Sequence, residues 1–141
     1  MGRGIHHMYT VMFLASILAG LGSSMNIWAD KWDDMYFNLN DVYMIGIMTG
    51  WMFFFMGLFT LDMYSLVGGL ISAIVFFIAI RSQWFINEYQ FARSMIPHHS
   101  MAIMMSKRLR VRPNNIKVLT NQIIQSQEEE IRYMKTLVHT E

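Results

Sequence analysis

The sequence contains no cysteine. Disulfides and zinc–thiolate sites are therefore excluded, and a soft metal ion would have to be held by methionine sulfur and histidine nitrogen. Charged residues are scarce as well, because they make up 15% of the 141 residues, whereas soluble domains usually carry about 25%. With 54% hydrophobic residues, this composition indicates a membrane protein, and the length leaves room for a short appended domain.

Charge is divided unevenly along the chain. Residues 1–80 contain two basic and five acidic residues, whereas residues 81–141 contain nine basic and five acidic ones. Three almost uncharged runs lie in the first part, and each approaches the roughly 20 apolar residues that cross a bilayer core of about 30 Å. We therefore expect a transmembrane domain in the lipid bilayer over residues 1–81. Its spans are predicted at about 8–29, 42–61 and 64–81.

The second run contains methionines at every fourth position, which places four thioethers along one slowly rotating face of a helix. Such a stripe can serve as a relay path for a cuprous ion. The plainer alternative is a flexible packing seam, since Gly46, Gly50 and Gly57 would let another helix approach. The stripe consists of Met44, Met48, Met52 and Met56.

Residues 82–141 are more polar, and their apolar residues recur at helical spacing. One stripe predicts a helix that ends near the basic stretch 107–112. Because no aromatic residue interleaves that stretch, we expect a solvated helix end and no nucleic-acid partner. Pro113 and Asn114 supply a turn, and a second helix is predicted over about 116–138. The first stripe consists of Phe91, Met95, His98, Ala102, Met105 and Leu109, and the second of Ile116, Leu119, Ile123, Gln127, Glu130, Met134 and Leu137.

The two predicted helices fold back on each other about the turn near residues 112–113. Equal steps outward from that turn place Met95 level with Glu130, and His98 level with Gln127. The polar residues that interrupt the two apolar stripes therefore lie at the same height along the hairpin, which predicts a site there. A buried carboxylate without a partner is costly, so Glu130 requires one.

Two adjacent histidines and several methionines lie at this height. Neighbouring residues on a helix point about 100° apart, so His98 and His99 cannot easily chelate one ion. Either of them could face the seam, which is the contact between the two helices of the hairpin. Mixed imidazole and thioether ligands favour Cu(I) and tolerate Ag(I). The alternative is a pair of core histidines satisfied by Glu130 and Gln127. The predicted metal ligands are Met95, His98, His99, Met101, Met105, Glu130 and Met134, with Gln127 and Met104 as secondary candidates.

These residues resemble a family filed as a domain of unknown function, number three hundred and five, in the ferritin-like group. Its members include periplasmic copper-binding proteins of the CopM type. The resemblance covers roughly residues 85–139, and the three predicted spans resemble a membrane-anchored branch of the family. The signature F-x3-M-I-P-H-H-x2-A-I-x-M is matched by Phe91, Met95, Ile96, Pro97, His98, His99, Ala102, Ile103 and Met105, and the signature I-x2-Q-x2-E-I-x2-M by Ile124, Gln127, Glu130, Ile131 and Met134.

The resemblance implies a helical bundle that binds copper through histidine and methionine and takes part in copper tolerance. Two positions depart from the family pattern. Met104 stands where an acidic residue is common, which makes the site softer, and Glu88 replaces the more usual Asp. We therefore expect an all-α chain with three transmembrane helices and an antiparallel two-helix hairpin over residues 82–141, of ferritin-like type.

Three functions are weighed against these residues. The leading one is a membrane-anchored copper-binding protein that buffers or transfers Cu(I). The alternative is an accessory subunit of a larger membrane complex with no metal of its own. A di-iron enzyme would need about four carboxylates and two Glu-x-x-His motifs, but only Glu88 and Glu130 are suitably placed, so no enzyme is expected.

Partners and location follow from the same features. A two-helix hairpin cannot bury both faces of its helices, so we expect a homo-oligomer or a subunit of a membrane complex, with His99 and Met104 as candidates for a shared site. Three spans place loop 30–41 on the same side as the hairpin. A thioether site without thiolate suits an oxidising compartment, which predicts a bacterial inner-membrane protein with an extracytoplasmic hairpin. The distribution of Lys and Arg favours the opposite orientation.

Overall fold

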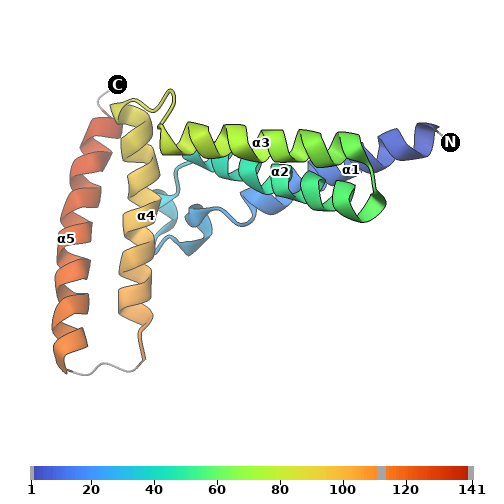
Figure 1. Cartoon of the computed structure of the whole chain (residues 1–141). Helices are drawn as coiled ribbons and strands as arrows, with labels where there is room; N and C mark the ends of the chain where they lie inside the picture. Colours follow the sequence, from blue (N-terminus) through green and yellow to red (C-terminus); the bar gives the residue numbers. More distant parts are fainter. Residues whose placement is uncertain (1, 111–113, 140–141) are drawn as a thin grey trace. The chain divides into compact units, whose positions relative to one another are not determined.

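The computed structural model describes residues 2–110 and 114–139, and every regular element in these two ranges is helical (Figure 1). The prediction of an all-α chain is confirmed. Pro113, predicted to form the turn, lies outside the described residues, as does Arg112. The α-helices are α1 (Gly2–Leu21), α2 (Leu39–Thr60), α3 (Met63–Arg81), α4 (Glu88–Arg108) and α5 (Asn114–His139), and two short 3-10 helices are η1 (Met25–Trp28) and η2 (Trp32–Asp34).

The chain divides into two compact units. The first contains Met1–Ser24 and Asn40–Phe85, and the second contains Met25–Leu39 and Ile86–Glu141. The segment between α1 and α2 thus folds with the C-terminal hairpin. The hairpin had been predicted to form a domain of residues 82–141 alone.

The first unit holds the apolar helices. Three segments in the described chain are long and apolar enough to cross a membrane, namely His7–Trp28, Leu39–Thr60 and Met63–Arg81. The predicted first span of about 8–29 agrees with the segment His7–Trp28, although α1 itself ends at Leu21. Gly22 and the two serines after it are poor helix formers, a break that uncharged composition alone does not reveal.

A tight turn joins α2 to α3. Leu61 adopts a left-handed backbone conformation with φ 57°, and Asp62 caps α3 by accepting hydrogen bonds from the backbone amides of Tyr64 and Ser65. The Tyr9 hydroxyl of α1 donates to Asp62 Oδ2 over 2.5 Å. A single carboxylate therefore ties all three apolar helices together at this end.

Glycines set the close approach of α2 to α3, which run side by side in Figure 1. A Cβ atom added to Gly69 would lie 2.3 Å from the backbone nitrogen of Phe54 and 2.6 Å from the carbonyl oxygen of Gly50. Backbone meets backbone here, so neither helix can yield by moving a side chain. Small residues at such crossings are typical of helices that pack in membranes.

The second unit is built on α4 and α5, which lie side by side in antiparallel directions (Figure 1). Both predicted stripes are rotated by about one residue from the buried faces, because Phe91, Met105 and Leu119 are exposed. The predicted stripe on α4 follows one of its apolar faces, but a different face contacts α5. The buried core of this unit consists of Ala92, Ile96, Ile103, Ile131, Met134 and Val138, with Tyr36, Tyr89 and Met95 packed against it.

The glycine crossing yields a first prediction. Gly69→Ala should lower the free energy of unfolding in detergent by about 1–3 kcal/mol, because the added methyl group overpacks the α2–α3 contact. Unfolding by titration with SDS, followed by circular dichroism, measures this change. Gly68→Ala is the matched control, since a Cβ atom there meets nothing within 4 Å. Equal effects of both substitutions would contradict the close contact.

Candidate functional site

The side chain of Ser100 lies at the centre of the second unit and is fully buried. Its hydroxyl donates to Asp34 Oδ2 over 2.6 Å, and its oxygen accepts from the backbone amide of Asp30 over 2.8 Å. This face of α4 is therefore covered by the segment Met25–Leu39.

Charged side chains reinforce this contact. Lys135 of α5 reaches Asp34 Oδ1 at 2.6 Å and Asp33 Oδ2 at 2.7 Å, while Lys107 reaches Asp30 at 2.8 Å. Burial by itself lowers the pKa of Lys135, but hydrogen bonds to Asp33 and Asp34 and their negative charges outweigh it and raise the pKa. The ammonium group thus stays charged and binds the segment to α5.

Arg93 holds the end of the same segment. Its Nε donates to the carbonyl oxygen of Phe37 over 3.1 Å, and its guanidinium carbon lies 5.8 Å from the ring centre of Tyr36. A further cation–π contact of 5.3 Å joins it to Tyr89 one helical turn earlier. The segment Met25–Leu39 is therefore bound to α4 near residues 30, 34 and 37.

His99 precedes Ser100 and points about 100° around the helix from it, toward α5. Its Nδ1 lies 3.0 Å from Glu130 Oε2, and its side chain is 11% exposed. The two groups are not aligned as a hydrogen bond, and Nδ1 has no hydrogen-bond partner in the part of the chain that the structure describes. The seam thus contains a sheltered imidazole whose polar atom is not fully satisfied.

The surroundings keep this imidazole neutral. Burial lowers the pKa of His99 below its usual value, and the neighbouring His98 lowers it further, whereas Glu130 acts in the opposite direction and only partly offsets burial. A neutral imidazole has one ring nitrogen with a free lone pair, which is the form that binds metal ions. His99 is therefore suited to be a ligand at neutral pH.

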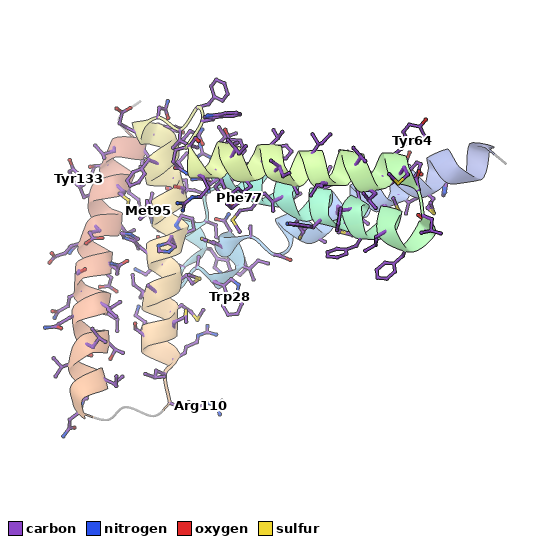
Figure 2. All side chains as sticks on the ribbon, viewed as in Figure 1. Trp28, Tyr64, Phe77, Met95, Arg110 and Tyr133 are labelled. Carbon is purple, nitrogen blue, oxygen red and sulfur yellow. The ribbon has the colours of Figure 1, made fainter. Side chains whose placement is uncertain are left out.

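Two thioethers lie one helical turn from this pair. Because α4 and α5 are antiparallel, one turn toward the start of α4 corresponds to one turn toward the end of α5, so Met95 falls level with Met134. Met134 is 8% exposed and belongs to the hairpin core, and Met95 packs against the same core (Figure 2). Nitrogen, oxygen and sulfur donors thus gather on two adjacent levels of the α4–α5 seam.

The predicted register was wrong by about one turn. Glu130 was expected to be buried and level with Met95, but its side chain is 50% exposed and lies beside His99. The prediction counted equal numbers of residues on both sides of the turn, as if both helices continued up to it. Leu109, however, already has an extended backbone. An extended residue advances about 3.3 Å and a helical one about 1.5 Å, so α5 begins further along the axis.

The other predicted ligands lie elsewhere. His98 is exposed, with its ring centre 5.9 Å from that of His99, and Met105 is also exposed. Met101, Met104 and Gln127 are half-buried. No group of three His, Asp or Glu side chains that could hold a metal ion occurs within residues 2–110 and 114–139, so any metal held at the predicted ligands would depend on thioethers.

The role of the segment Met25–Leu39 was not predicted from the sequence, and neither were the contacts of Ser100 and Lys135. Charge complementarity was the available signal, because this acidic loop had to lie on the same side as a strongly basic hairpin. No prediction was made of what covers the polar face of α4. A polar face can equally be covered by another polar segment when its groups find partners.

The buried ion pair yields a second prediction. Asp34→Ala should lower the free energy of unfolding of the second unit by about 3–5 kcal/mol, because it leaves Lys135 and Ser100 without their buried partner. Hydrogen exchange at the amides of α4 and α5 measures the loss. Asp33→Ala is the matched control: Asp33 binds the same lysine but is 73% exposed, against 4% for Asp34, so its effect should stay within about 1 kcal/mol. A larger loss for Asp33→Ala than for Asp34→Ala would contradict this assignment.

Known proteins match both the hairpin and the whole chain. A family model described as Domain of unknown function (DUF305) matches residues 88–141. The "Uncharacterized protein L153" of Acanthamoeba polyphaga mimivirus is 38% identical over 138 residues, which cover 93% of this chain and 91% of that protein. No solved structure matches the chain significantly. The match across α4 and α5, together with a relative similar over nearly its full length, shows that the chain belongs to the DUF305 family.

Proposed function

We propose that this chain is a membrane-anchored protein that binds Cu(I) at the α4–α5 seam and buffers the ion or transfers it to a partner. The observation that carries the proposal is the sheltered imidazole of His99, which makes no hydrogen bond in the described chain through Nδ1. It is placed one turn from the level shared by Met95 and Met134. The three apolar helices support membrane attachment.

The donor set fits a soft monovalent ion. Imidazole nitrogen and thioether sulfur bind Cu(I) without being deprotonated, and both favour it over hard ions such as Mg²⁺. The carboxylate of Glu130, at 3.0 Å from His99, would balance the single positive charge of the ion. Copper binding is also what the signature resemblance implies for this family. The residues that would hold the ion are Met95, His99, Glu130 and Met134.

Binding without catalysis is part of the proposal. A di-iron oxidase needs several carboxylates at one place, whereas Glu130 is the carboxylate that lies against the seam histidine. The thioethers that accompany it are ligands for a soft ion that is held and released. Copper tolerance would follow from lowering the concentration of free Cu(I).

Substitution of the two histidines tests the site. His99→Gln should weaken Cu(I) binding by at least about tenfold, the lower end of the loss seen even for residues that only support a ligand. Competition with a colorimetric Cu(I) chelator measures the affinity of the purified full chain in detergent. His98→Gln is the matched control, because His98 is the adjacent residue but exposed, and its affinity should be unchanged.

Two outcomes would overturn the hairpin site. One is unchanged affinity in His99→Gln, and the other is an equal loss in both variants. Met134→Leu, which conserves volume within the core, gives a second reading, with Met105→Leu as its exposed control. Unaltered binding in Met134→Leu would remove the thioether from the proposed ligand set.

The proposal includes an extracytoplasmic hairpin in a bacterial inner membrane. A soft site built without cysteine remains functional where thiols would be oxidised to disulfides. A reporter enzyme that is active only outside the cytoplasm, fused to the C-terminus, should therefore be active, and its fusion to the N-terminus should be inactive because three spans separate the ends. The reverse pattern would place the hairpin in the cytoplasm, as the distribution of Lys and Arg favours.

A second candidate is an accessory subunit of a larger membrane complex, or a homo-oligomer. It is supported by large side chains that are exposed on the hairpin, namely Phe91, Met105 and Leu137, and Tyr133 projects from α5 away from α4 (Figure 2). Such a face is typical of surfaces that bind another protein. Absence of stoichiometric copper from the purified chain would favour this candidate.

A further inference from the structure

The methionine stripe of α2 divides into two halves that differ in their surroundings. Met52 accepts a hydrogen bond at its sulfur from Ser16 Oγ over 3.2 Å, and Ser16 is fully buried in α1. Met56 is buried as well. The thioethers of this half are therefore part of the packing between helices.

The other half borders an open space. Met44 and Met48 line a cavity of about 230 Å³ between α2 and the end of α1. Asp41 lines it too, three residues before Met44, so all three side chains lie on one side of α2 over two turns. Asp41 is 5% exposed. The complete lining is Gly20, Ser23, Ser24, Asp41, Met44, Ile45 and Met48.

Gly20 determines how closely the helices meet beside this cavity. A Cβ atom added there would lie 2.6 Å from Ile45 Cγ1 and 3.0 Å from Met48 Cε. The side chain of Met48 is thus held against α1. Because α1 ends at the next residue, Leu21, the space beyond this contact stays free, and the thioethers border it.

We propose that this cavity is a second soft-metal site, which binds Cu(I) or Ag(I) through the thioethers of Met44 and Met48 and the carboxylate of Asp41. Thioethers select soft ions. Asp41 is the one charged residue of the lining, and its single negative charge would balance a monovalent ion in a site of low polarity. A hard divalent ion would require six or more oxygen ligands or retained water, which this lining does not offer.

The cavity site is independent of the hairpin site. It shares no residue with Met95, His99, Glu130 or Met134, and it belongs to the other unit of the chain. Its residues come from the apolar helices α1 and α2. Failure of one site therefore does not imply failure of the other.

The test measures how many Ag(I) or Cu(I) ions the full chain binds in detergent micelles, by equilibrium dialysis and elemental analysis. A background variant with His99→Gln and Met134→Leu isolates the cavity and should retain about one ion per chain. Adding Met44→Leu and Met48→Leu to it should lower the affinity by at least about tenfold. Asp41→Asn alone should also weaken binding, and X-ray absorption of the background variant should show sulfur neighbours around copper.

The matched control is Met52→Leu with Met56→Leu, which makes the same change on the same stripe outside the cavity and should leave binding intact. Leucine and methionine have similar volumes, so folding should be retained in both pairs. The cavity site is overturned if the background variant binds no ion, if the Met44 and Met48 pair binds as before, or if both pairs lose binding equally. If the hairpin site alone is wrong, the unmodified chain binds one ion. That ion is then lost in the variant with Met44→Leu and Met48→Leu and kept in the variant with Met52→Leu and Met56→Leu.

Discussion

The buried hydrogen bond from Ser100 to Asp34 sets the rotation of α4, and the site depends on that rotation. Once Ser100 faces the segment Met25–Leu39, the preceding residue must turn about 100° away from it. His99 is thereby directed at Glu130 on α5, and His98 is left exposed. A helix turned by one residue would exchange these roles. The two adjacent histidines are thus distinguished by the contact of Ser100, which is not among the proposed ligands.

Much of the fold could be predicted from the sequence because its signals are strong and local. Long uncharged runs determine the apolar helices, and the spacing of hydrophobic residues determines the two helices of the hairpin. The end of α1 at Leu21 was missed because Gly22, Ser23 and Ser24 are uncharged and resemble a continued span. The rotation of both hairpin helices was also missed, since α4 has more than one apolar face and Phe91 and Met105 formed a regular stripe on the wrong one.

The candidate site was predicted in its residue types more than in its geometry. Met95, His99, Glu130 and Met134 were all named from the sequence, because unusual donors at one height of a hairpin are visible in the pattern. Which of these residues lie level across the hairpin was not predicted correctly. The extended backbone at Leu109 shifts α5 by about one turn against α4, and the spacing of hydrophobic residues does not indicate this shift. The contact of Asp34 with Ser100 and Lys135 was invisible for another reason: it joins residues 66 positions apart or more, and only the folded chain brings them together.

The interleaved order of the two units has a consequence for how the protein is made. Asp34 leaves the ribosome well before Ser100 and Lys135, with α2 and α3 synthesised in between. Domains generally fold as units during synthesis, N-terminal parts first, but this segment cannot complete its unit until α2 and α3 have been synthesised and the hairpin has emerged. The second unit can therefore be completed only after the whole of the first unit has been synthesised.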